Sequence, residues 1–536
     1  MKSKVLGLSI GIIVVLIGII GLSYNSNNKN TFTQDGVTYA LTLDGASINT
    51  FPSKGMYRAD VKCTNASGKW LYDEWMLAIE DIISDNITCD IDFTTIEKTN
   101  LNDYIISLSG SKQGTGQVVD ELNATVADYT NANPIAQSDY NSLTMYKDSS
   151  SSSTSGTANT NSFIFSGNSW SSVPNNLTSG DFYHIKFRPS TSGHYQVCYT
   201  MSSGHSSNLL YIFKGTSYRY INGKISLSAS TDSSKEGCVD IGYVDTNTDV
   251  RIVQRAYSNS SYPIATIAFN LQKSTNAKSI DTGYRYEGKN PNNYIWFNNE
   301  LWRIIGVFDE NSHGESEQNL VKIIRNNSLG GLAWHKSNTN DWTTSSLMNL
   351  LNGVYLNAEN GTDSGYCYGY STEVPSNCDY TNTGINDTYR PMIENVTWYL
   401  GGNPSSNVTS EEFYLYERGY SGRSTEWEGK IGLMYPSDYG YSVLARSCAR
   451  TTNLGDYDTA ICGAKSWLYG QGYEWTITLN TPSGGFAFYL DEQGNLSSVD
   501  RTVNFGYGVR PVLYLNSSVY VIDGNGSQAD PYIIGI

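Results

Sequence analysis

The eight cysteines of this chain constrain its fold more than any other sequence feature. They fall into four neighbouring pairs with long gaps between them: Cys63 and Cys89, Cys198 and Cys238, Cys367 and Cys378, and Cys448 and Cys462. An even number of cysteines grouped in this way predicts four local disulfides in an exported chain. Zinc sites need close ligand spacing such as C-x2–4-C, and the sequence has none. We therefore expect disulfides rather than a metal site or free thiols.

The first pair also indicates where its bridge lies. Apolar residues alternate with polar ones over 57–63, which ends in Cys63, and again over 87–93, which contains Cys89. Because side chains alternate across a strand, each cysteine falls on the apolar face of its own strand. Two facing strands would bring the sulfur atoms into bonding range.

The N-terminus carries the signal for export. Lys2 and Lys4 precede an apolar run from Val5 to Leu22, and the sequence then becomes abruptly polar. A run of about 18 residues is close to the minimum that crosses a bilayer as a helix, and the flanking lysines place its start in the cytoplasm. We expect residues 1–23 to be a signal anchor and single-pass transmembrane helix in the cell membrane, with the bulk of the chain extracellular. A cleaved signal peptide is the alternative, and it exports the same residues.

Composition and charge limit the fold and the partners. A chain of 536 residues needs several domains, and its polarity comes from Ser, Thr, Asn, Gly and 41 Tyr rather than from charge. Residues of these types favour β-structure and exposed recognition surfaces. The net charge of −16 repels phosphate backbones, which excludes nucleic acid as a partner.

Turn signals and composition shifts predict a multidomain, mostly β chain. After the anchor we expect a polar stalk (24–36), a small β-sandwich (37–125), a Ser-rich linker (126–162), a jelly-roll-like β-sandwich (163–273) and a C-terminal α+β domain with an antiparallel sheet (280–536). The expected strands of the small sandwich are Val37–Leu43, Tyr57–Cys63, Trp70–Ile79 and Ile87–Thr94. A short helix is expected over 101–108.

The middle sandwich should hold seven strands: Phe182–Phe187, His194–Thr200, Leu209–Lys214, Lys224–Ala229, Cys238–Val244, Val250–Ala256 and Ile264–Leu271. Within it, DFYHIKFRPSTSGHYQVCYT (181–200) resembles the jelly-roll modules appended to secreted bacterial proteins, which commonly bind glycans or serve as spacers.

The last domain should combine hairpins with two helices. Tyr294–Phe297 and Leu301–Phe308 flank an Asn-Asn-Glu turn and predict a hairpin. Leu347, Leu350, Leu351 and Val354 have helical spacing, with Thr343 or Thr344 as the N-cap, and so do Tyr389, Met392, Ile393 and Val396. Further strands are expected at Val321–Arg325, Lys430–Tyr435, Trp475–Leu479, Phe486–Leu490, Leu496–Val499 and Val509–Leu515.

Several phrases carry a family resemblance. They are FPSKGMYRADVKCTNASGKW (51–70), GYRYEGKNPNNYIWFNNELWRIIGVF (283–308), KIGLMYPSDYGYSVL (430–444), YEWTITL (473–479) and GVRPVLYLNSSVYVIDGNGSQADPYII (508–534). They resemble an uncharacterised family of N-terminally anchored surface proteins from low-GC (Firmicutes- or Mollicutes-like) gut bacteria, with the 131–273 module inserted. More distantly, the ending G-V-R-P-V is similar to the close of C-type-lectin-like folds and of formylglycine-generating enzymes. That fold implies a central final strand and binding loops before it. The enzyme's activity is not implied, because it needs a reactive cysteine pair that binds copper.

The sequence offers no catalytic constellation. None of the five histidines has a second histidine at metal-ligand spacing, and G-x-S-x-G and phosphate-binding glycine loops are absent. A glycosidase needs two carboxyls across a sugar site, and the acidic clusters are more typical of a solvated surface. We therefore expect no catalytic residue and no firm metal site.

Calcium is the one cofactor that the sequence allows. Asp523, Asn525, Ser527 and Asp530 offer oxygen ligands at close spacing, and Asp245, Asn247 and Asp249 do the same in the middle module. Both stretches lack the fixed glycine and distal glutamate of an EF-hand loop. Hairpin turns are the competing interpretation of both.

Aromatic residues are the candidate binding residues. Trp427, Trp467, Tyr469 and Tyr473 lie among Gly, Asn and Ser in predicted loops of the last domain. Flat aromatic faces beside polar groups suit sugar rings or protein partners, whereas core packing is the alternative. The sequence thus predicts an adhesin-like surface protein that binds a glycan or protein at the cell surface. A structural spacer of the envelope and a glycan-acting envelope enzyme are the alternatives.

Overall fold

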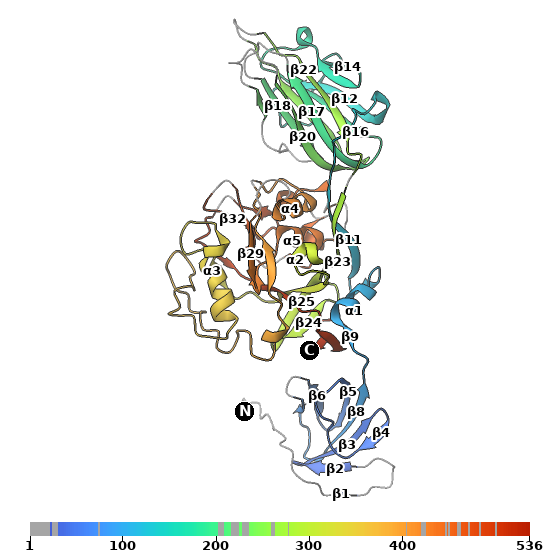
Figure 1. The fold of residues 1–536 in the computed structure, drawn as a ribbon, viewed down its shortest axis with the longest axis vertical. Helices are drawn as coiled ribbons and strands as arrows, with labels where there is room; N and C mark the ends of the chain where they lie inside the picture. The colour runs from blue at the N-terminus through green and yellow to red at the C-terminus, as the bar shows by residue number, and fades with distance from the viewer. Residues whose placement is uncertain are drawn as a thin grey trace, which may run out of the picture.

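The computed structural model divides the chain into three parts that lie one after another along its longest axis (Figure 1). The structure describes residues 22–23 and 31–536, except 73–74, 202–207, 216–224, 228–234, 259–262, 277, 404, 420–424, 445–447, 449–450, 458–461, 470–471, 482–483 and 499–500. The N-terminal module and the middle module lie at opposite ends, and the last domain lies between them. The chain is mostly β, as the sequence predicts.

The predicted membrane anchor falls almost entirely outside the described residues. Its last two residues form β1 (Leu22–Ser23), which pairs with β2 (Thr31–Gln34). In the part of the chain that the structure describes, none of the helices has the length and apolar character needed to cross a bilayer.

The N-terminal module is one sheet covered by a hairpin. The sheet runs in the order β1, β2, β3 (Val37–Leu43), β8 (Ile87–Thr95) and β5 (Tyr57–Thr64), with β4 (Ala46–Ile48) on β3. The hairpin consists of β6 (Ser67–Leu71) and β7 (Met76–Glu80). Trp70, Ile91 and Phe93 are buried in the shared core. The predicted single strand 70–79 is therefore wrong, and the predicted stalk already contains β2, because Phe32 packs on Tyr39.

The middle module is a sandwich of two antiparallel sheets. One sheet runs β13 (Thr157–Ala158), β12 (Tyr140–Asp148), β16 (Phe182–Pro189), β21 (Val250–Arg255), β18 (Asn208–Lys214) and β19 (Ile225–Leu227). The other runs β14 (Phe163–Ser166), β15 (Ser169–Ser172), β22 (Ile267–Lys273), β17 (Gly193–Met201) and β20 (Lys235–Val244). All seven predicted strands are present, within a few residues at their ends.

The predicted linker 126–162 is wrong in its central part. β12 lies inside it and pairs with β16 along the sandwich, with Tyr140 and Tyr146 buried. The Ser-rich stretch after β12 is a loop, and its Ser153 carbonyl accepts hydrogen bonds from the Tyr146 hydroxyl and the Arg251 guanidinium. Composition correctly predicted a loop at the serines, but it did not reveal the neighbouring strand with its buried tyrosines.

The last domain is built on a large antiparallel sheet assembled from distant segments. Its order is β10 (Lys112–Gln113), β11 (Gly116–Val126), β23 (Lys278–Gly288), β25 (Glu300–Phe308), β26 (Leu320–Arg325), β35 (Val512–Leu515) and β30 (Ile431–Gly432), with β24 (Tyr294–Phe297) on β25. The predicted 294–308 hairpin is confirmed, and Asn298 and Asn299 both adopt positive φ at its turn.

Residues 99–126 belong to this last domain and not to the small sandwich. β9 (Thr99–Asn100) pairs with β36 (Tyr520–Asp523), which also pairs with β37 (Ile533–Gly535), and helix α1 (Leu101–Ser107) buries Leu101 and Ile105 in the core of the last domain. β11 then pairs with β23 along its whole length. The predicted boundary at residue 125 is therefore wrong. The middle module is inserted between two adjacent strands, where Val126 lies opposite Lys278.

A second, smaller sheet lies in the last domain. It runs β27 (Gly331–Ala333), β34 (Gly506–Gly508), β31 (Glu474–Leu479), β32 (Ala487–Leu490) and β33 (Leu496–Ser497). β28 (Val396–Tyr399) pairs with β29 (Glu426–Gly429) in a separate ribbon.

The helices of the last domain match the sequence only in part. The first predicted helix is a 3₁₀ turn η3 (Trp342–Thr344), helix α3 (Ser346–Asn349) and a π-helical segment η4 (Leu350–Tyr355), with Ser345 rather than a threonine as the cap of α3. The second is wrong, because 389–396 forms only a 3₁₀ turn before β28. Helices α4 (Ser410–Glu417) and α5 (Pro436–Tyr441) take its place, and Thr409 and Glu412 form a capping box on α4.

All four predicted disulfides form. Cys63–Cys89 and Cys198–Cys238 each join directly opposed residues of adjacent strands, and Cys367–Cys378 and Cys448–Cys462 each tie loops of the last domain. No free cysteine is found among the described residues.

Candidate functional site

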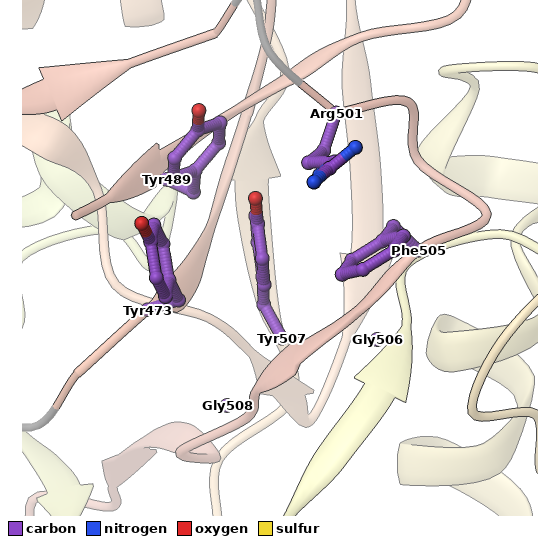
Figure 2. Close-up of a pocket in the computed structure, with 7 residues that line it drawn as sticks. All are labelled: Tyr473, Tyr489, Arg501, Phe505, Gly506, Tyr507 and Gly508. Atoms are coloured by element: carbon purple, nitrogen blue, oxygen red, sulfur yellow. The ribbon is translucent and has the colours of Figure 1, made fainter. Parts of the chain in front are cut away.

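An open cleft of about 730 Å³ lies over the second sheet of the last domain. Its lining consists of Tyr473, Tyr489, Arg501, Phe505, Gly506, Tyr507 and Gly508. Figure 2 shows the hydroxyl groups of the three tyrosines pointing the same way, with Arg501 and Phe505 beyond Tyr507. The cleft size is typical of small-ligand sites, and its walls are largely aromatic.

Strand pairing brings these residues together from separate segments. Tyr473 directly precedes β31, and Tyr489 lies in β32 opposite Trp475. Tyr507 lies in the centre of β34, which pairs with β31 through Gly508 and Glu474. The cleft therefore rests on hydrogen-bonded strands rather than on loops alone.

A buried ion pair fixes the strands beneath the cleft. The Arg510 guanidinium donates from Nε and Nη2 to the two carboxylate oxygens of Glu474, each at 2.8 Å, and both side chains are almost fully buried. Burial raises the pKa of the Glu474 carboxyl, and the opposing charge of Arg510 lowers it in part. Since Glu474 adjoins Tyr473 and Arg510 follows β34, this pair holds the two sides of the cleft in register.

Close backbone contact explains one of the glycines under the cleft. A Cβ atom at Gly506 would lie 2.3 Å from the carbonyl oxygen of Gly369, which is far inside van der Waals contact. Only glycine allows β34 to approach this neighbouring loop.

The aromatic rings form a continuous surface around Tyr507. The Tyr473 and Tyr507 rings stack with centroids 5.0 Å apart and planes 13° apart. Trp475 and Tyr489 each lie 4.7 Å from Tyr507, and Phe505 lies 5.4 Å away. Tyr507 and Tyr489 are buried edges of this surface, whereas Tyr473 is 40% exposed. A ligand would meet the face of Tyr473 first.

Burial keeps Tyr507 neutral, and Arg501 places a positive group at one end of the cleft. Burial and the neighbouring Tyr489 raise the pKa of Tyr507, and Arg501 lowers it in part. The Tyr507 hydroxyl thus stays protonated and can donate a hydrogen bond. The Arg501 guanidinium lies 4.9 Å from the centre of the Phe505 ring, a cation–π contact on the surface of the cleft.

The predicted site residues do not lie together in the structure. Tyr473 lines the cleft, but Trp427, Trp467 and Tyr469 do not. Trp467 is buried, its Nε1 donates to the Tyr286 carbonyl at 2.8 Å, and the Arg303 guanidinium covers its ring. The prediction that Trp467 is exposed is therefore wrong, because the loop folds inward onto the large sheet.

Trp427 and Tyr469 are half-buried against the core. The Trp427 ring meets Trp342 edge-on at 6.1 Å and lies over Gly429, where a Cβ atom would clash with it. The Tyr469 ring packs against Gly494 in the same way. Packing within the domain accounts for these two contacts without a ligand.

The two candidate calcium stretches form turns and ion pairs. Asp245 Oδ1 accepts from the Asn247 backbone N–H and the Thr248 hydroxyl, and Asp249 pairs with Arg188 at 2.8 Å. These contacts place the middle stretch in a hydrogen-bonded turn.

In the C-terminal stretch, Asn525 Oδ1 accepts from the Ser527 N–H, and the Ser527 hydroxyl accepts from the Asp530 N–H. Asp523 accepts from the Tyr72 hydroxyl and lies 3.8 Å from Arg58. Over the described part of the chain, no group of three or more His, Cys, Asp or Glu side chains is placed to hold a metal ion. Calcium binding stays a prediction.

Sequence reasoning missed Tyr489, Arg501, Phe505 and Tyr507. A signal was available for the last two, because Phe505-Gly506-Tyr507-Gly508 alternates aromatic and glycine with the period of a strand. Such alternation places both rings on one face with no side chains on the other. Nothing in the sequence indicated that Tyr489 and Arg501 join that face.

Comparison with known proteins adds little. No protein-family model matches the chain, and no curated protein matches it. A solved structure similar to part of the chain is the secreted serine protease VesC from Vibrio cholerae, with a TM-score of 0.16 and 11% identity over 36% of this chain and 31% of that chain. A likeness this low carries no argument, and the resemblance to anchored surface proteins stays a prediction.

Proposed function

We propose that this chain is a membrane-anchored extracellular binding protein, whose last domain recognises a glycan through the cleft around Tyr473 and Tyr507. The single observation that carries the proposal is an aromatic surface, partly exposed, held on a rigid sheet by the buried Glu474–Arg510 pair. Stacked rings beside hydroxyl groups suit the apolar faces and hydroxyl edges of sugars. A preformed surface also loses little entropy on binding.

Export supports the proposal. Four disulfides indicate an oxidising compartment, and the apolar run 5–22 behind two lysines suits an anchor in the cell membrane. We also propose a C-type-lectin-like last domain, in which G-V-R-P-V ends the fold and Arg510 secures the strands below the ligand. The row of three parts in Figure 1 favours a second candidate, a spacer that holds the last domain away from the membrane.

A glycan array tests the proposal with the full chain in detergent micelles. Wild type should bind a defined set of glycans, and Tyr473→Ala should weaken binding about tenfold or more, because an exposed aromatic contact is typical of a binding hot spot. Tyr257→Ala is the matched control, since Tyr257 is 37% exposed in the middle module. Absence of any glycan binding by wild type, or equal losses in the two variants, would contradict the proposal.

A further inference from the structure

Arg501 is the cation among the described residues that line the cleft, and none of those residues is acidic. The ion pairs of the described residues do not include it, and its contact is with the face of Phe505. In a chain with net charge −16, most exposed charge repels anions. A guanidinium left open beside a ligand-sized cleft therefore marks the place where a negative group is tolerated.

The tyrosine hydroxyl groups complete this arrangement. Figure 2 shows the hydroxyls of Tyr473, Tyr489 and Tyr507 on one side of the cleft, with the Arg501 guanidinium beyond Tyr507. Hydroxyl groups donate hydrogen bonds, and a guanidinium presents paired N–H groups that match the two oxygens of a carboxylate. Tyr473, which is 40% exposed, supplies the apolar contact for a ring, and the buried Tyr507 ring stacks against it.

We propose that the ligand of this cleft is a glycan that carries a carboxylate, as sialic acid and uronic acid residues do. This inference rests on the proposed function and names its ligand class. The carboxylate bonds to Arg501, the sugar ring packs on Tyr473, and the hydroxyl of the exposed Tyr473 bonds to a ring substituent. An acidic peptide would satisfy Arg501 as well, but the flat ring face of Tyr473 beside several hydroxyl groups favours a sugar.

The experiment compares two probes of nearly equal size on the full chain in detergent micelles. The first is sialyllactose, and the second is the same trisaccharide with its carboxylate converted to the amide. Calorimetric titration should give binding about tenfold or more tighter for the acid, since hydrogen bonds to charged groups are the stronger ones. Arg501→Gln should reduce this preference to about one, and Arg501→Lys should keep part of it because the charge remains.

Lys112→Gln is the control, because it removes one exposed positive charge from β10, at the end of the large sheet. It should leave the preference unchanged, whereas a general charge effect would lower it equally. Galacturonate oligomers serve as a second acidic probe. Equal binding of acid and amide, both sensitive to Tyr473→Ala, would overturn the carboxylate inference and leave the proposed function intact. Failure of every sugar would overturn both, and binding of a polyglutamate peptide in place of the sugars would overturn the glycan assignment.

Discussion

The middle module and the last domain assemble their strands and place their aromatic residues differently. Both are rich in strands and aromatic residues, and each contains a buried histidine. The middle module forms from one contiguous stretch, and its largest rings, such as Trp170 and Phe187, lie inside the sandwich. The last domain takes strands from both sides of that insertion and leaves Tyr473 exposed on its second sheet. The exposed aromatic cleft thus lies in the domain whose strands come from farthest apart in the chain.

Deletions should show the largest difference between these regions. Replacing residues 127–277 with Asn-Gly should leave the last domain folded, because Val126 and Lys278 are already paired and a two-residue turn can join them. Removing residues 1–126 should abolish folding of the last domain, because α1 and β11 are lost from its core and sheet. Thermal unfolding followed by tryptophan fluorescence measures both. The middle module should still unfold cooperatively in the second deletion, and a second cooperative transition, from the last domain, would contradict the sheet order.

Loss of an ion pair should give the next largest difference in stability between the two regions. Arg510→Ala leaves the buried Glu474 carboxylate without its partner and should destabilise the last domain by about 3–5 kcal/mol. The matched change Arg188→Ala removes a half-exposed pair with Asp249 in the middle module and should cost about 0–1 kcal/mol. Urea unfolding of each variant gives the two values. Similar values for both would show that burial does not distinguish these pairs.

The buried histidines should give the two regions the same dependence of stability on pH. Burial lowers the pKa of His313 in the last domain and of His184 in the middle module, each to about 4. His313 Nε2 donates to the Phe308 carbonyl, and Nδ1 accepts from the Glu315 N–H, so the neutral ring is fully bonded.

The unfolded state binds a proton near pH 6.5 and the folded state only near pH 4, so stability present above pH 6.5 is lost as the pH falls toward 4. The loss should approach about 3 kcal/mol for each histidine. Denaturant unfolding from pH 4 to 7 should show a smaller pH slope for His313→Gln in the last domain and for His184→Phe in the middle module. An unchanged slope in either variant would contradict burial of that histidine in the neutral form.

Glu417 should give an effect of similar size and opposite sign, in the last domain alone. Burial raises its pKa to about 8, and its carboxyl group bonds to the hydroxyl and the backbone N–H of Ser437. The folded state keeps the proton while the unfolded state loses it above about pH 4.5, so wild type loses stability as the pH rises through 8. Glu417→Gln cannot ionise and should gain about 3–4 kcal/mol over wild type between pH 5 and 8. An equal difference in the free energy of unfolding between Glu417→Gln and wild type at pH 4.5 and at pH 8 would exclude ionisation of Glu417 as the cause.

Local patterns decided which predictions were correct. The alternation over 57–63 and 87–93 predicted both strands and the Cys63–Cys89 bridge, since neighbours along a strand carry that information. Helical spacing failed at 389–396, because Pro391 stands within that stretch and Val396 pairs into β28. Thr409 and Glu412 form a capping box, a local signal for the start of α4 that the spacing of apolar residues does not reveal.

The candidate site was predictable only where exposure follows from local sequence. Tyr473 lies outside the strand that follows it and stays exposed, whereas Trp467, in the same connection before β31, turns inward to Tyr286. The partner that buries Trp467 lies in β23, 181 residues earlier in the chain, and single-sequence patterns do not contain that pairing.

The sequence by itself determined the strand-rich composition, the four cysteine pairs and most strands of the middle module, because these depend on residues close along the chain. Tertiary structure decided that α1 and β11 belong to the last domain and that Tyr489, Arg501 and Tyr507 share one cleft with Tyr473. Strand partners and burial depend on contacts between distant segments, where many pairings are equally compatible with local alternation. The packed core selects one of them.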